Sequence, residues 1–366
     1  MGGSRRESRI AGALIVGLAA AGAHLARGPS DRAGNVPDRA PSGSAGPSDG
    51  PWDGGRGQLA RSPAGLTRVA WKEVIWRVKD EIARDRVMIV AGGVTFYAIL
   101  SLFPMITAFV SVYGLFADTA NVARLVSSLQ GAIPQEALAL ISEQLERLVA
   151  IDSGALSVAS LVALAIAFWS ANGGMKGLIE AMNVAYDERD ERGFIRSNLL
   201  SMALTIGAML LVAGIIFVSA ILPAVLSVVP GESVRDTLLL YARWPVMALV
   251  LVTALSVLYR FAPDRRDAKW RWITPGSLLA AVGLMLASAA FALYTANFAA
   301  YNETYGSIGA VVAVMVWLWI ASIVVIIGAE LNAEMEHQTA QDTTIGKDRP
   351  MGERGAAMAD KVAPPP

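Results

Sequence analysis

The stretch "AGGVTFYAILSLFP", residues 91–104, combines the composition of a membrane-spanning helix with residues that such a helix does not need. It lies inside a run without charged residues from Val87 to Ala117, which is longer than the roughly 20 residues that cross a bilayer as a helix. Two adjacent glycines, a threonine, a tyrosine, a serine and a proline interrupt its apolar residues. We therefore expect a transmembrane helix with one face that contacts something other than lipid.

The whole chain has the composition of a protein with several membrane spans. Hydrophobic residues make up 54% and charged residues 17% of its 366 residues, whereas soluble domains have about 25% charged residues. Six nearly charge-free runs are long enough to cross a bilayer: Val87–Ala117, Gly154–Ala171, Leu199–Val229, Leu238–Tyr259, Ile273–Phe298 and Gly306–Ala329. Lipid offers the backbone no hydrogen-bond partner, so each run should be helical. This predicts an all-α fold, a polytopic helical membrane protein with six transmembrane helices plus amphipathic interfacial helices.

The distribution of lysine and arginine predicts how the chain is oriented. These residues concentrate in short loops on the cytoplasmic side of a membrane. Residues 61–86, 172–198 and 260–272 together carry sixteen of them, and the three alternate loops carry four. We therefore expect a multi-pass protein of a bacterial inner membrane, with the segment before the first span and the C-terminus in the cytoplasm.

The two ends of the chain lie outside the predicted membrane domain of residues 66–337. In residues 1–27, an apolar run fits an extra span, a signal peptide or a start codon assigned too early. Cleavage as a signal would export the basic segment at 61–86, which conflicts with the charge rule. Residues 28–65 are rich in Gly, Pro, Ser and Asp and predict a disordered linker, and residues 338–366 predict a disordered cytoplasmic tail.

Two segments outside the apolar runs have helical periodicity. Between residues 66 and 86, five apolar residues share one helical face: Trp71, Val74, Ile75, Val78 and Ile82. This pattern fits a helix in the cytoplasmic interface, and it fits equally a helix packed under the bundle. Residues 122–149 predict a helical hairpin over the outer face.

Small residues also predict features of single helices. A row of mostly small residues on one face of the last span predicts a packing seam: Gly306, Ala310, Ala313, Trp317, Ala321 and Gly328. The pair Gly173 and Gly174 predicts a break of the second span at the membrane edge.

The residue types exclude several kinds of chemistry. The chain has no cysteine, and its two histidines, His24 and His337, lie near its ends. These counts exclude disulfides, thiol catalysis and cysteine metal sites. The sequence has no phosphate-binding loop and no nucleophile elbow. We therefore expect no catalytic residues, no metal and no cofactor. Since the net charge is zero, we also expect no nucleic-acid partner.

Polar side chains in or beside the spans are the candidate functional residues. A polar pathway is predicted from Tyr97, Ser101, Asn172, Tyr294, Asn297, Tyr301 and Glu330. For Tyr97 and Ser101 a helix–helix contact is the alternative role. A carboxylate such as Glu330 is costly at a membrane edge unless water or a cation meets it, and its alternative role is a salt bridge to the basic loop. Contacts to lipid phosphate are predicted for Arg243, Arg260 and Arg271.

Four blocks in this order resemble the YihY/BrkB family of bacterial inner-membrane proteins: "AGGVTFYAILSLFP", "FWSANGGMKGLIEAMNVAY", "LYRFAPDRRDAKWRWITPGSLLA" and "YGSIGAVVAVMVWLWIASIVVIIGAELNAE". The resemblance covers about residues 70–336. It implies an integral membrane protein of six helices with both ends of the core in the cytoplasm. The family's activity is poorly defined: members were labelled ribonuclease BN, others were linked to virulence, and members are discussed in envelope lipid transport.

The ribonuclease label finds no chemical basis in the residues. Metal-assisted hydrolysis of RNA needs histidine or carboxylate ligands in one pocket, and no such spacing occurs. The charged run at 187–192 is typical of a solvated loop. Two classes of function remain. One is a protein that transports or handles an envelope lipid or a small amphipathic solute, and the other is a non-catalytic membrane scaffold or envelope-assembly factor. Expected partners are membrane lipids and either a second copy of the chain or an envelope protein.

Overall fold

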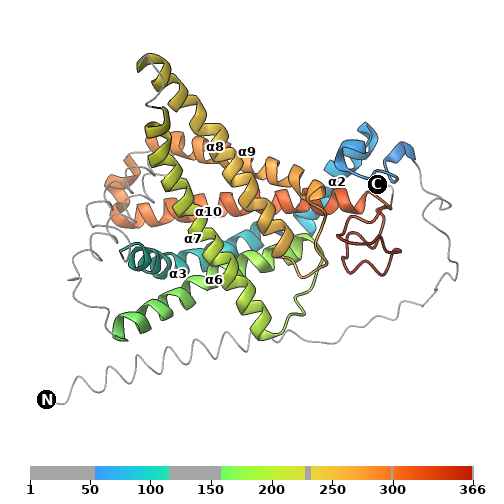
Figure 1. Ribbon diagram of the computed structural model, residues 1–366, viewed down its shortest axis with the longest axis horizontal. Helices are drawn as coiled ribbons and strands as arrows, with labels where there is room; N and C mark the ends of the chain where they lie inside the picture. The colour runs from blue at the N-terminus through green and yellow to red at the C-terminus, as the bar shows by residue number, and fades with distance from the viewer. Residues whose placement is uncertain (1–53, 115–157, 227–231, 298–299, 365–366) are drawn as a thin grey trace. The chain divides into compact units, whose positions relative to one another are not determined.

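The computed structural model describes residues 54–114, 158–226, 232–297 and 300–364, and all structural statements below refer to these residues (Figure 1). Two short 3₁₀ helices and seven α-helices follow one another: η1 (Gly54–Arg56), η2 (Pro63–Gly65), α2 (Arg68–Arg84), α3 (Val87–Gly114), α6 (Val158–Ala185), α7 (Phe194–Leu226), α8 (Glu232–Phe261), α9 (Trp270–Asn297) and α10 (Ala300–His337). Over this part of the chain there is no sheet, and one isolated bridge joins Ala268 to Thr344. The all-α prediction is confirmed.

The long helices overlap the six apolar runs. Four helical stretches are long and apolar enough to cross a membrane: Phe194–Leu211, Trp244–Phe261, Trp270–Thr295 and Val311–His337. Helices α2 and α3 form a pair bent by 62°, which counts as a fifth candidate span if it is taken as one unit. The described residues therefore contain four or five candidate spans. The predicted outer hairpin at 122–149 and the apolar run of residues 1–27 lie outside the described residues.

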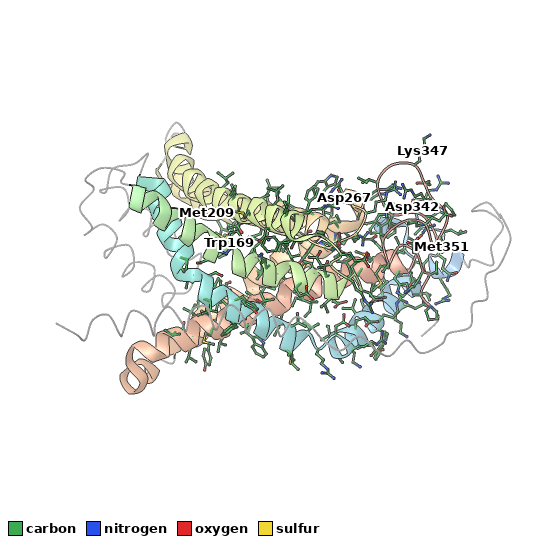
Figure 2. All side chains as sticks on the ribbon, turned by 90° about the horizontal axis from the view of Figure 1, so that it is seen from below. Trp169, Met209, Asp267, Asp342, Lys347 and Met351 are labelled. Atoms are coloured by element: carbon green, nitrogen blue, oxygen red, sulfur yellow. The ribbon has the colours of Figure 1, made fainter. Side chains whose placement is uncertain are left out.

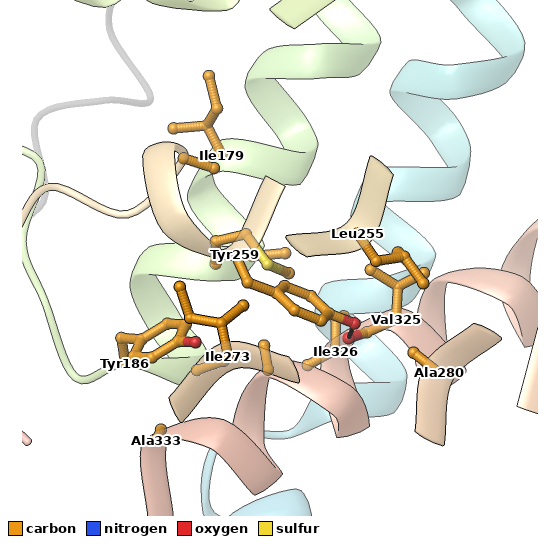
Figure 3. Close-up of a cluster of buried hydrophobic side chains, with 14 of the residues drawn as sticks. Ile179, Tyr186, Leu255, Tyr259, Ile273, Ala280, Val325, Ile326 and Ala333 are labelled. Carbon is orange, nitrogen blue, oxygen red and sulfur yellow. Dashed lines mark hydrogen bonds between the residues drawn. The ribbon is translucent and has the colours of Figure 1, made fainter. Parts of the chain in front are cut away.

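Helix α10 is the central element of the described bundle. It packs against α9 on one side and α3 on another, and it also contacts α2 and α6 (Figure 1). Helix α3 runs along α6, and α8 packs against both α7 and α9. The main apolar core lies where α3, α6, α8, α9 and α10 meet, and it includes Met182, Tyr259, Ile273 and Ile326 (Figure 3).

Helices α9 and α10 approach most closely at two glycines. A β-carbon added at Gly276 would overlap the carbonyl oxygen of Gly328. A β-carbon added at Gly328 would lie 2.5 Å from the hydroxyl of Tyr259 and 2.8 Å from the side chain of Ala280. That hydroxyl donates a hydrogen bond of 2.8 Å to the carbonyl of Val325, which ties α8 to α10 (Figure 3). The predicted packing seam of the last span is thus a true helix contact at Gly328.

Helix α2 packs on the bundle, which decides between the two roles expected for it. Val74 and Val78 are buried with Trp272 of α9 and with Leu331 and Met335 of α10. The hydroxyl of Thr67 caps the start of α2 by accepting the backbone N–H of residue 70 at 3.2 Å. Because the part of its apolar face that holds Val74 and Val78 is covered by protein, α2 anchors the segment that leads into α3, whereas Ile75, expected on the same face, is 61% exposed.

The prediction that Gly173 and Gly174 break the second span is wrong. Helix α6 runs without interruption from Val158 to Ala185. The glycines instead allow α3 to approach, since the hydroxyl of Ser101 accepts the backbone N–H of Gly174 at 2.8 Å. A β-carbon at Gly174 would lie only 3.2 Å from that hydroxyl oxygen.

The structure also differs from the disorder expected for the linker and the tail. Residues 54–65 and 338–364 have defined positions and bind each other, because Thr339 donates its hydroxyl to the carbonyl of Ala60 at 2.7 Å. The buried guanidinium of Arg354 donates to four backbone carbonyls, those of residues 340, 341, 349 and 359. Burial opposes the charge of Asp342, but hydrogen bonds from Thr344 and the backbone of residue 349 outweigh it and lower its pKa. Polar side chains bound to backbone groups thus add to a few buried apolar side chains, among them Ala60 and Met358, in holding this segment.

Candidate functional site

Polar residues lie where α6 meets α3 and where it meets α7, and all of them are buried except Lys176, which is partly buried. We call this set the polar file: Ser101, Asn172, Lys176, Asn198, Ser201 and Thr205. The ammonium of Lys176 donates to the amide oxygen of Asn198 at 2.7 Å. Thr205 Oγ1 lies 2.8 Å from the carbonyl of Ser201 and 3.4 Å from Asn172 Oδ1. Polar contacts therefore continue between α6 and α7 from Lys176 to Asn172, and Ser101 of α3 makes a separate contact with α6 at Gly174.

Two predicted pathway residues belong to the polar file, and a third lies beside it. Ser101 and Asn172 are buried, with exposed fractions of 5% and 1%. Tyr97 lies one turn before Ser101, is half exposed, and packs its ring edge against Phe96 at 5.5 Å between centroids. A β-carbon added at Gly177 of α6 would contact that tyrosine ring at 3.5 Å.

A second polar group surrounds the last turns of α10. We call Glu330, Glu334 and Glu336 the α10 carboxyl cluster, and all three side chains are fully buried. Arg77 of α2 binds Glu334 through its Nε and reaches Gln338 at 2.5 Å. Helix α2 is therefore joined to the end of α10 by an ion pair as well as by apolar contacts.

Glu336 has a buried partner from the loop that follows α8. Arg265 donates to it at 2.6 Å, and the exposed fractions of the two side chains are 1% and 0%. The hydroxyl of Thr343 also donates to Glu336, at 2.6 Å. Burial opposes the charge of Arg265, but the adjacent carboxylate outweighs it and raises the pKa of the guanidinium. The central carbon of the Arg265 guanidinium lies 4.8 Å from the centre of the Tyr186 ring. Burial raises the pKa of Tyr186 well above its usual value.

Glu330 lies apart from these cations. Its carboxyl group faces that of Asp85, the residue that ends α2. Neither oxygen of Glu330 receives a hydrogen bond from a protein N–H or O–H donor among the described residues. Arg260 instead lies 3.8 Å from Asp267 and 4.3 Å from the ring of Trp270, and Arg271 is exposed. The alternative role expected for Glu330, a salt bridge to this loop, is not what the structure contains.

The remaining predicted residues are only partly described. Tyr294 is half exposed near the end of α9 and lies beside Phe291, with 6.1 Å between ring centroids. The side chains of Asn297, Tyr301 and Arg243 lie outside the described residues. The structure thus places Ser101 at the contact of α3 with α6, Asn172 at the contact of α6 with α7, and Glu330 at the separate cluster near α2.

Sequence reasoning missed four residues around α10 that the structure brings together: Arg77, Asp85, Tyr186 and Arg265. The arginines were interpreted only as orientation signals. One available signal was the spacing of Glu330 and Glu334, because carboxylates four residues apart share a helix face and need partners there. No group of three or more histidine and acidic side chains in the described ranges is placed to hold a metal ion.

The loop that follows α8 and the tail enclose the end of α10. The backbone N–H of Ile345 donates to the carbonyl of Asp267, and Lys269 donates to the carbonyl of Asp342. Figure 2 shows Asp267, Asp342, Lys347 and Met351 grouped at one end of the helices, away from Trp169 and Met209.

Comparison with known proteins assigns this arrangement to a family. The family model described as virulence factor BrkB matches residues 78–352, from the middle of α2 to the folded tail. The chain belongs to the BrkB virulence factor family. No solved structure matches it.

The relatives of this BrkB family protein are named as membrane proteins or by likeness to ribonuclease. The ribonuclease-like protein YfkH of Bacillus subtilis is 30% identical over 260 residues, which is 66% of this chain and 88% of the relative. The UPF0761 membrane protein VP0125 of Vibrio parahaemolyticus is 25% identical over 266 residues, 70% of this chain and 80% of the relative. A UPF0761 membrane protein of Aliivibrio salmonicida is 24% identical over 277 residues, 73% and 84% of the two chains. The family is thus one of membrane proteins without a known enzymatic activity.

Proposed function

We propose that this BrkB family protein moves an anionic amphipathic lipid, or a small solute of similar chemistry, across the inner membrane, with the polar file as the path of the head group. The polar file is the observation that carries the proposal. Isolated serine and threonine side chains in a span often bond only to their own helix or to a neighbour. Here a cation stands at the end of a series of polar groups shared by α6 and α7, and Ser101 of α3 contacts the same stretch of α6.

Lys176 is the residue best suited to meet a lipid phosphate. Its ammonium is partly buried and lies 5.7 Å from the ring of Trp169 on the same helix. Trp169 has an exposed fraction of 53%. Tryptophan prefers the level of lipid head groups, and a lysine beside it can contact phosphate while its alkyl stem lies along apolar surface. The pair therefore resembles an entry point from the lipid rather than a buried structural contact.

The lipid proposal predicts that Lys176→Met slows the movement of anionic lipid. Losing one charge-assisted hydrogen bond costs about 1.5–3 kcal/mol, so we expect a rate roughly tenfold or more lower. The measurement uses purified protein in vesicles with a fluorescent anionic phospholipid and an impermeant quencher. Lys79→Met is the matched control, because Lys79 lies 4.6 Å from the ring of Trp76 on α2, away from the polar file.

Equal rates for Lys176→Met and the wild-type protein would contradict the polar file as a route. If wild-type vesicles move neither lipid nor solute and the purified protein retains a membrane partner in fixed proportion, the scaffold function replaces the proposal. Degradation of RNA by the purified protein would support the activity for which the relative YfkH is named.

The proposed orientation, with the start of the core and the C-terminus in the cytoplasm, gives a second prediction. Because the chain lacks cysteine, single cysteines report their side of the membrane without background. Ser142→Cys should react with an impermeant maleimide added to intact spheroplasts, and Asp190→Cys should react only after lysis. Reaction of Asp190→Cys before lysis would reverse the orientation.

A further inference from the structure

The corner between α2 and α3 is built around a residue in an unusual backbone conformation. Asp85 ends α2, and Arg86 has a φ of +51°, in the left-handed region that non-glycine residues seldom occupy. The two helices diverge there by 62°. Such a conformation persists only where surrounding contacts hold it, so the contacts of Asp85 matter for the position of the corner.

Glu330 of α10 lies beside the corner, and its carboxyl group and that of Asp85 act on each other. Glu330 has an exposed fraction of 0%, and the described residues supply no N–H or O–H donor to either of its oxygens. Two ionised carboxylates side by side would repel each other, and that of Glu330, buried and without a donor, would also lose its hydration. A single proton between them removes one charge and supplies the missing donor. Carboxyl pairs in proteins are known to share a proton in this way.

The other charged groups around the pair do not supply a compensating cation. On α2, Glu81 faces the pair, and Arg84 binds Glu81 while its own side chain is 68% exposed. After α6, Asp187 also faces Asp85. Two arginines nearby are bound to other carboxylates of the cluster, Arg77 to Glu334 and Arg265 to Glu336. The side chain of His337 also lies against Glu334, at 3.5 Å.

Two buried polar groups near Glu330 also lack a full set of partners. The hydroxyl of Tyr186 and the amide nitrogen of Asn332 are both buried without a hydrogen-bond acceptor at bonding geometry. The amide oxygen of Asn332, by contrast, accepts the backbone N–H of Gly276 at 2.8 Å. These polar atoms can hydrogen-bond a water molecule beside the acidic pair. A proton bound by the pair needs such a water molecule in order to leave.

We propose that Asp85 and Glu330 form a proton-binding site that holds the α2–α3 corner against α10 and releases it when the proton departs to water. The step is simple in chemical terms. One O–H bond breaks, the proton goes to a water molecule, and two carboxylates remain that repel each other. The site is separate from the polar file, and none of the tests below measures lipid movement, so this proposal and the proposed function can fail independently.

The first test detects the proton directly. Infrared spectra of the wild-type protein at neutral pH should contain a C=O band of a protonated carboxylic acid that is lost in Glu330→Gln. Glu180→Gln is the matched control, because Glu180 is an exposed carboxylate on α6. A band of equal intensity in the wild-type protein and in Glu330→Gln would overturn the proposal.

The second test follows stability against pH. A site that binds a proton in the folded protein and not in the unfolded one loses stability as the pH rises, about tenfold in the folding equilibrium for each pH unit. Between about pH 6 and about pH 9, where buried carboxyls are known to titrate, the melting temperature of the wild-type protein should therefore fall. Glu330→Gln should remove that fall. A pH dependence that is the same in both proteins would contradict the proposal, and so would stabilisation of the wild-type protein by sodium over choline at high pH, because it would mean a metal cation binds instead.

The third test follows the corner itself. A single cysteine at Ala91, which is fully buried one turn into α3, should react with maleimide slowly at neutral pH and faster at high pH. A cysteine at Met88, which is 61% exposed, corrects for the ionisation of the thiol. After this correction, an Ala91→Cys rate that does not increase with pH would show that loss of the proton leaves the corner in place.

Discussion

Replacing Gly276 by alanine should remove most of the folded protein from detergent extracts. A β-carbon at this position would overlap the carbonyl oxygen of Gly328 and lie 2.5 Å from the side-chain amide of Asn332. Backbone atoms cannot move aside as a flexible side chain can, so α9 and α10 would have to separate. Added methylene groups in packed cores typically cost about 1–3 kcal/mol, and an overlap with backbone belongs at or above the upper end of that range. Gly328→Ala should have a similar effect, through Tyr259.

Gly207→Ala is the matched control for this prediction. Gly207 lies in α7, another candidate span, and a β-carbon there would meet no atom within 4 Å. Alanine is the better helix former by about 1 kcal/mol, so this variant should be at least as stable as the wild-type protein. The measurement is the yield of monodisperse protein after gel filtration together with the melting temperature. Equal yields for Gly276→Ala and Gly207→Ala would mean that α9 and α10 do not meet at this contact.

The second large effect is expected at the buried ion pair of Arg265 and Glu336. Removing one partner of such a pair leaves an uncompensated charge and typically costs about 3–5 kcal/mol, so Arg265→Met should lower the melting temperature strongly. Replacing both residues by methionine should recover much of the loss, because no buried charge remains. Arg84→Met serves as the control, since Arg84 is 68% exposed and an exposed pair contributes only about 0–1 kcal/mol. If the double variant is less stable than Arg265→Met, the pair is not the source of the effect.

The spans could be predicted because the bilayer imposes a local rule. A run of about 20 apolar residues is enough to specify a helix, whatever the rest of the chain does. The spacing of apolar residues also predicted the helix whose apolar face includes Val74 and Val78, but it could not decide whether lipid or protein would cover that face. The glycines at 173 and 174 were misread because a glycine pair weakens a helix and equally lets another helix approach, and only the position of Ser101 distinguishes the two.

The candidate site was harder to predict because its contacts are distant in sequence. Arg77 and Glu334 are separated by 257 residues, and no local pattern connects them. Glu330 could be predicted as a candidate because a carboxylate is unusual at the edge of an apolar span. Asp85 could not, because acidic residues are common at the ends of amphipathic helices. The tail was expected to be disordered from its composition. Composition measures apolar content and cannot register that Arg354 and Asp342 bind backbone groups.

The two arginines bound by the α10 carboxyl cluster have a bearing on how the chain is inserted. Arg77 and Arg265 are among the residues that predict which loops stay in the cytoplasm, and each is synthesised before its partner, by 257 and 71 residues respectively. While the earlier spans enter the membrane, both guanidinium groups are therefore uncompensated, which is when a positive charge can retain a loop. Their neutralisation waits for the last helix to leave the ribosome. The charges that predict the orientation are thus the same ones that, once paired, hold α2 and the loop after α8 to the end of α10.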